Sequence, residues 1–196
     1  MVNTKKENIP QLFDKLFKIL SGSRFINREG LGGNKPIFIQ PYEIAQQVAV
    51  DEQIQSLIKR LNAANVPVLA IDLYNLCLDV LKAKGTLQKV LENEQNLPKR
   101  EFKRNLQGSL SVKDNIMPYI QEKMKESEHR MVFIYGIDKV YQQLSMVPVL
   151  VNIQSLLNNE PFIFFYPGLY DNYSLNLFGS INEDNEYRAF NLNNYN

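Results

Sequence analysis

The chain has 196 residues, of which 44% are hydrophobic and 22% are charged, and its formal net charge is +1. This length predicts one domain with a sizeable core. Because the net charge is near zero, overall charge cannot attract this protein to nucleic acid. One cysteine, Cys77, and one histidine, His129, exclude an internal disulfide framework and a four-ligand Cys/His zinc site within the chain.

Hydrophobic periodicity predicts the structural elements in chain order. Apolar residues at helical spacing indicate a first helix over 9–21, and a glycine-bearing loop then leads to a strand over 36–42. The following elements are predicted as helix 51–64, strand 67–72, helix 73–84, short helix 87–91, helix 111–126, strand 131–136, helices 137–145 and 148–157, and strand 161–166.

Two regions depart from this alternation. Residues 92–110 are polar and predict short helical pieces or a mobile connection, so 92–128 is the least defined part of the chain. The segments 175–178 and 187–192 flank GSINEDNE and predict a β-hairpin at one edge of the sheet. Apolar strands that alternate with amphipathic helices predict one α/β domain over 1–196, a three-layer α/β/α fold with a mainly parallel sheet.

The apolar runs also bear on location. The longest is far shorter than the roughly 20 residues that a membrane helix needs. The stretch MVNTKKENIPQLF lacks the apolar core of a secretory signal, and a single cysteine fits a reducing compartment. We therefore expect a cytoplasmic protein without membrane contact.

The stretch EGLGG, with Glu29, Gly30 and Gly32, has the composition of a phosphate-binding loop. A phosphate loop follows a strand and opens a helix, whereas these glycines precede a predicted strand. We interpret the stretch as the turned entry to that strand. Serine–histidine and cysteine–histidine catalysis are also disfavoured, because His129 precedes the strand 131–136 and active sites form at the opposite edge of a parallel sheet.

Polar and aromatic residues gather where the predicted strands end, which is the edge at which open α/β sheets bind ligands. Three of them, Asp72, Asp138 and Asp171, could together hold Mg²⁺ and support a metal-dependent phosphoesterase or nuclease. Each of the three also has a structural use as a helix cap or turn former. Tyrosines at this edge could line a partner groove, or bury their rings with the hydroxyl at the rim.

One short basic cluster, formed by Lys99, Arg100, Lys103 and Arg104 around Phe102, suggests weak, non-specific DNA binding as a further alternative. Such a cluster also suits the solvated face of a helix. The near-zero net charge favours the second interpretation.

Several stretches together resemble the B-protein family of the BREX phage-defence systems (BrxB), formerly a domain of unknown function. The most specific combination is the turn Tyr-Pro-Gly-x-Tyr-Asp with a later Tyr-Arg-Ala-Phe. The stretches are RFINREGLGGNKPIFI (24–39), VLAIDLYNLCLDVL (68–81), FIYGIDKVY (133–141), FIFFYPGLYDNYSLNLFG (162–179) and NEYRAFNL (185–192).

The resemblance implies a bacterial antiviral component that works with a large ATPase, a DNA methyltransferase and a PglZ-like protein of the alkaline-phosphatase type. It implies a non-catalytic adaptor without a cofactor, built like a P-loop nucleotide-binding domain that lacks its phosphate loop. It leaves the oligomeric state open. We predict that Arg188 pairs with Asp171. The predicted interface comprises Tyr74, Tyr166, Pro167, Gly168, Tyr170, Asp171 and Arg188.

Overall fold

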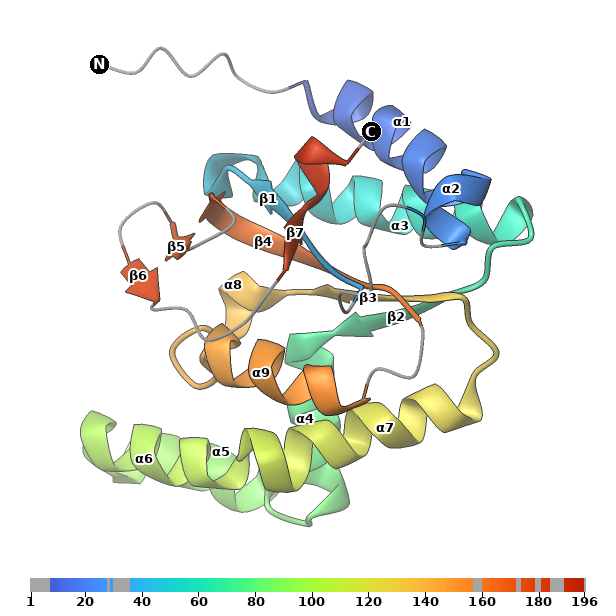
Figure 1. Ribbon diagram of the computed structural model, residues 1–196. Coiled ribbons are helices and arrows are strands. Elements are labelled where there is room, and N and C mark those ends of the chain that lie inside the picture. Colours follow the sequence, from blue (N-terminus) through green and yellow to red (C-terminus); the bar gives the residue numbers. More distant parts are fainter. Residues whose placement is uncertain are drawn as a thin grey trace, which may run out of the picture.

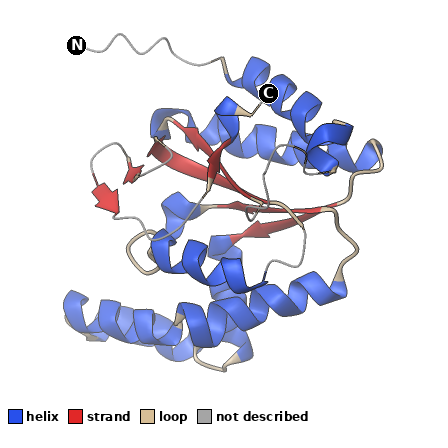
Figure 2. Ribbon diagram, viewed as in Figure 1, coloured by secondary structure: helices blue, strands red, loops and turns tan. Residues whose placement is uncertain are grey.

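The computed structural model describes residues 8–27, 29, 36–156, 160–171, 174–178, 181–183 and 189–195. They form a three-layer α/β/α fold around a mainly parallel sheet (Figures 1 and 2). This arrangement confirms the predicted fold class. None of the helices in these ranges is both long and apolar enough to cross a membrane.

The parallel strands are neighbours in an order that differs from their order in the chain. They are, across the sheet, β2 (Val68–Asp72), β3 (Met131–Tyr135), β4 (Phe162–Tyr170), β1 (Ile37–Tyr42) and β7 (Phe190–Asn191). β3 and β4 are buried along almost their whole length, and both lie inside the sheet. Their unbroken apolar runs are typical of parallel strands that helices cover on both faces.

Two groups of helices cover the two faces of the sheet (Figure 1). One face carries α1 (Ile9–Ser21), α2 (Ser23–Ile26), the 3₁₀ turn η1 (Ile44–Gln46) and α3 (Gln47–Ala63). The other carries α4 (Leu73–Ala83), α7 (Met117–Glu126), α8 (Ile137–Val140) and α9 (Met146–Leu156). α8 is shorter than the helix predicted over 137–145.

The least defined region of the sequence is helical. It contains α5 (Leu87–Asn96), α6 (Lys99–Ser109) and a π-helical turn, η2 (Val112–Ile116), that runs directly into α7. α5 and α6 lie outside the sheet-covering layer (Figure 1). They attach to the core through buried Leu106 and through Val90 and Phe102, which are partly buried. Of the two alternatives predicted for 92–110, the structure therefore shows the short helical pieces.

β4 is longer than the predicted strand 161–166, and the turn predicted at Tyr-Pro-Gly is wrong. The chain stays extended through Tyr170 because residues 168–170 pair in antiparallel fashion with β5 (Leu175–Leu177). Gly168 permits this pairing, since a Cβ at that position would lie only 2.2 Å from the backbone oxygen of Asn176. Tertiary pairing thus overrides a strong local turn signal.

The C-terminal hairpin exists, but its second strand is not the predicted segment 187–192. β5 pairs instead with β6 (Ile181–Glu183), whereas β7 pairs in parallel with β1. That placement brings the ring of Phe190 to 5.7 Å from Phe38. The following 3₁₀ turn η3 (Leu192–Asn194) buries Leu192 completely. Contacts with the sheet therefore decide the partner of β7.

Candidate functional site at the carboxyl edge of the sheet

The carboxyl ends of β1, β2 and β3 are followed by helices on different faces of the sheet. α3 follows β1 onto one face, whereas α4 and α8 follow β2 and β3 onto the other. The point where successive helices change faces is where open α/β sheets form a ligand-binding crevice. The side chains that α3 and α8 bring to this edge therefore form the candidate site.

A chain of hydrogen bonds links β1, α3 and α8. The Tyr42 hydroxyl donates to Oε1 of Gln47, and Gln47 Nε2 donates to Asp51 Oδ1 over 2.8 Å. On the other side of Asp51, Lys139 Nζ donates to Oδ2 over 3.3 Å. This network holds the first turns of α3 against α8. It also occupies both carboxylate oxygens of Asp51.

Asp138 brings one unsatisfied carboxylate oxygen to the site. Its Oδ1 is buried and has no hydrogen-bond partner in the part of the chain that the structure describes. Burial raises the pKa of this carboxyl, Lys139 opposes that rise, and Asp51 adds to it. Burial, reinforced by Asp138 and Asp51, also raises the pKa of Tyr42. The Tyr42 phenol is therefore neutral at physiological pH.

Asp72 is occupied as a helix cap, as its position predicted. Its Oδ1 accepts the backbone N–H groups of Tyr74 at 2.9 Å and Asn75 at 3.3 Å. Gly136 faces it in the left-handed region, with a φ of 74°, and a Cβ there would lie 2.7 Å from the same oxygen. The close approach of Gly136 keeps the end of β3 beside the cap.

The predicted three-carboxylate metal site is not formed. Asp171 accepts hydrogen bonds from the backbone N–H and hydroxyl of Ser174, at 2.7 and 3.2 Å, and so closes a turn. Asp138 lies in the first turn of α8, where Gly136 rather than an aspartate is the N-cap residue. Over the described ranges, no three Asp, Glu, His or Cys side chains are grouped so that they could hold a metal ion.

The predicted interface residues of β4 mostly point inward. Tyr166, Pro167, Gly168 and Tyr170 are buried, whereas Asp171 is exposed. The Tyr170 hydroxyl donates to the carbonyl of Ala189 over 2.8 Å, and burial raises the pKa of Tyr170 to about 12. These tyrosines tie β4 to its neighbours. Leu169, 64% exposed, is the side chain of this strand that faces solvent.

Large apolar side chains are exposed around the same edge. Within the described ranges, the exposed large apolar side chains are Ile44, Val48, Tyr74, Leu91, Tyr141, Val151 and Leu169. Five of these seven follow the carboxyl ends of strands or extend one, and we call them the apolar rim: Ile44, Val48, Tyr74, Tyr141 and Leu169. Exposed apolar residues scattered singly are ordinary, but a group at one edge is typical of an interaction site.

Other predicted residues lie away from this edge or outside the described ranges. Gly30, Gly32 and Arg188 lie outside the described ranges. The carbonyl of Glu29 accepts a hydrogen bond from the Tyr195 hydroxyl over 2.9 Å. The predicted basic cluster lies on α6, where its four side chains are exposed: Lys99, Arg100, Lys103 and Arg104.

Sequence reasoning missed the contribution of α3 to the site. Gln47, Asp51 and Gln55 follow one another at intervals of four residues, so they share a helix face. Gln55 Nε2 donates to the Tyr135 hydroxyl over 3.2 Å, which extends the network to the end of β3. The four-residue spacing just after a strand was the available signal.

Comparisons with known proteins agree with the resemblance seen in the sequence. A family model described as "BREX protein BrxB" matches residues 69–192. A protein of that name from Bacillus cereus (strain H3081.97) is 30% identical over 188 residues, covering 94% of this chain and 97% of the relative. Another, from Escherichia coli O9:H4 (strain HS), is 23% identical over 173 residues, covering 88% of this chain and 86% of the relative.

Proposed function

The chain belongs to the BREX protein BrxB family, and from this premise we propose that it is a non-catalytic adaptor of a BREX-type antiphage defence complex. Family membership implies a role in BREX phage defence. The proposed partners are the PglZ-like protein of the alkaline-phosphatase type and the large ATPase that the resemblance associates with this family. The adaptor would meet them in the bacterial cytoplasm.

The apolar rim is the observation that carries this proposal. β2, β3, β4 and β1 are adjacent, so at a spacing of about 4.8 Å the rim extends over roughly 15 Å. Val48 is 75% exposed and Leu169 is 64% exposed, so both side chains have apolar area to remove from water on binding. A cluster of this width suits the centre of a protein interface, where a few large side chains supply most of the affinity.

The polar groups behind the rim support a binding role over a hydrolytic one. Asp72 caps α4, Asp51 is paired with Lys139, and Asp171 closes a turn. Hydrolysis needs a nucleophile, or a metal-bound water, within reach of a base. These carboxylates instead fix the loops that carry the rim. The rim therefore rests on a rigid support, which lowers the entropy cost of docking.

Co-purification tests the proposal directly. The chain would be co-expressed with the PglZ-like protein and the large ATPase of its own defence system, and pulled down through a tag. Val48→Asp and Leu169→Asp place a charge on exposed apolar positions, and each should weaken capture by at least about tenfold, since a charge in an interface core is costly. Leu91→Asp makes the same change on α5, away from the rim, and should leave capture intact.

Two results would count against the proposal. If neither partner is captured by the wild-type chain, the adaptor role is wrong. If both rim variants bind like Leu91→Asp while retaining the wild-type melting temperature, the adaptor uses another surface. Because the substituted side chains are exposed, folding is expected to survive each change.

A further inference from the structure

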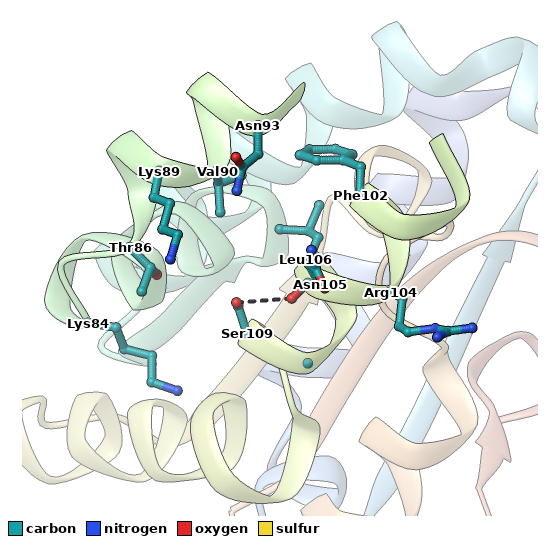
Figure 3. Close-up of a pocket in the computed structure, with 11 residues that line it drawn as sticks. Lys84, Thr86, Lys89, Val90, Asn93, Phe102, Arg104, Asn105, Leu106 and Ser109 are labelled. Carbon is teal, nitrogen blue, oxygen red and sulfur yellow. Dashed lines mark hydrogen bonds between the residues drawn. The ribbon is translucent and has the colours of Figure 1, made fainter. Parts of the chain in front are cut away.

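A second concave site lies between α5 and α6, and none of its lining residues belongs to the apolar rim. Its volume is about 570 Å³, enough for a nucleotide-sized ligand. Figure 3 shows Lys84, Thr86 and Lys89 approaching from one side and Asn105 and Ser109 from the other. We call this site the α5–α6 pocket. The adaptor proposal does not use it.

The charge of the pocket is one-sided. Lys84, Lys89 and Arg104 line it, and no aspartate or glutamate does. Lys84 Nζ donates to the side-chain oxygen of Asn115 over 2.6 Å, and within the described ranges none of the three cations forms an ion pair with a carboxylate. Three unneutralised cations in a concave site favour an anionic ligand.

The charge continues beyond the pocket along α6. Between residues 84 and 109 the chain carries six basic and three acidic residues, a net charge of +3, whereas the whole chain carries +1. Lys99, Arg100 and Lys103 are exposed on α6 and do not line the pocket. Arg104 points away from the centre of the pocket in Figure 3. A ligand with several phosphates in a row matches this extension better than a mononucleotide does.

The pocket also offers groups that contact a base. Phe102 lies on its wall and is only partly buried, because one side of it packs on the core while α6 leaves the rest accessible. Asn93 and Asn105 present amide groups that both donate and accept hydrogen bonds. Stacking on an aromatic ring beside a basic groove is the usual way in which proteins hold unpaired bases.

From these observations we propose that the α5–α6 pocket binds single-stranded nucleic acid. One nucleotide occupies the pocket, with its base against Phe102 and its phosphate beside Lys84 and Lys89, and the strand continues past Arg104 along α6. Duplex DNA is disfavoured, because its bases are stacked on one another and cannot enter a pocket. The backbone of an acidic peptide could pair with the two amides, but its carboxylate side chains offer no planar group to stack on Phe102.

Fluorescence anisotropy with a labelled 20-nucleotide oligothymidine tests this proposal. Three phosphate contacts predict a log–log salt slope of about −2, so affinity should fall about 20-fold between 50 and 200 mM salt. The double variant Lys84→Gln/Lys89→Gln should weaken binding at least about tenfold. It should also make the salt slope shallower by about 1.4, because two phosphate contacts are lost. Lys59→Gln, on α3 across the sheet, is the matched control and should change neither value.

Phe102→Leu separates stacking from charge. It should weaken binding at least about fivefold and leave the salt slope unchanged, because no phosphate contact is lost. Its melting temperature must be measured as well, since Phe102 is partly buried. The substituted lysines are exposed, so their variants test the pocket even where Phe102→Leu is destabilised.

Several outcomes would overturn the proposal. They are the absence of oligothymidine binding by the wild-type chain at 50 mM salt, an affinity of the lysine double variant equal to that of Lys59→Gln, and equal or tighter binding of a 20-base-pair duplex. Binding of polyglutamate with the affinity of oligothymidine would also overturn it, because it would leave charge alone as the determinant.

Discussion

Substitution of Gly168 by alanine tests the unexpected end of β4. The φ of Gly168 is 159°, at the end of the positive range that residues with a Cβ rarely adopt, so the dihedral angle already strains an alanine there. The added methyl group adds a clash. It would lie 2.2 Å from the oxygen of Asn176, 3.1 Å from the carbonyl carbon of the same residue and 3.0 Å from the nitrogen of Phe178.

All three atoms belong to the backbone of β5 or of the residue after it, so no side-chain rotation relieves the clash. Either the strands separate locally or β5 shifts, and Leu175 and Leu177 on β5 are both buried. Forced overpacking of this kind costs about 1–3 kcal/mol. Reduced freedom of the unfolded chain returns about 0.5 kcal/mol. We expect a net loss of about 2 kcal/mol, or roughly 4–8 °C in Tm for a chain of this size.

Thermal and urea unfolding followed by circular dichroism measure this loss. Gly108→Ala provides the matched control, because Gly108 lies inside α6 and a Cβ there meets nothing within 4 Å. The control should be stabilised by about 0.5 kcal/mol through helix propensity. A Gly168→Ala variant as stable as wild type would show that β4 and β5 do not approach so closely.

Two further predictions concern buried ionisable groups. Burial raises the pKa of Asp138 above its ordinary value of 3.8, so the unfolded state loses its proton first and the native state loses relative stability as pH rises through that interval. Asp138→Asn should therefore raise Tm at pH 7. After solvent screening, the gain in the free energy of unfolding should be no more than about 1 kcal/mol, and near pH 3 the variant should be as stable as wild type. A variant that is less stable than wild type at pH 7 would contradict this. Burial, with a smaller contribution from Asp72, raises the pKa of Cys77 to about 12, so Ellman's reagent at pH 8 should label the thiol only after unfolding, and rapid labelling of the native chain would contradict its burial.

The parallel core was predictable because its strands carry unbroken apolar runs, as in β3 and β4, and its helices carry clear amphipathic stripes. The end of the chain was not. Pro167-Gly168 is a turn signal by local criteria, and only the pairing with β5 keeps it extended. Likewise, several short segments could pair with 175–177, and the ring contact between Phe38 and Phe190 exists only once the sheet has assembled.

The candidate site likewise contains residues that were predictable from the sequence and residues that were not. Asp72 could be assigned as a cap because a cap depends on its own chain segment alone. The exposure of Val48 and Leu169 depends on which surfaces the other layers cover, so neither residue was distinguished in the sequence from a core residue. Asp51 was missed for a related reason, since its partner Lys139 comes from a different helix.

The central position of β1 affects how the chain is made. β1 emerges early from the ribosome, yet its two neighbours begin at residues 162 and 190. At about 5–20 residues per second, the nascent polypeptide exposes the Ile37–Ile39 run for roughly 6–25 s before β4 arrives. If translation stalls before residue 162, this apolar strand has no partner strand to pair with. The incomplete chain would then bind chaperones or aggregate.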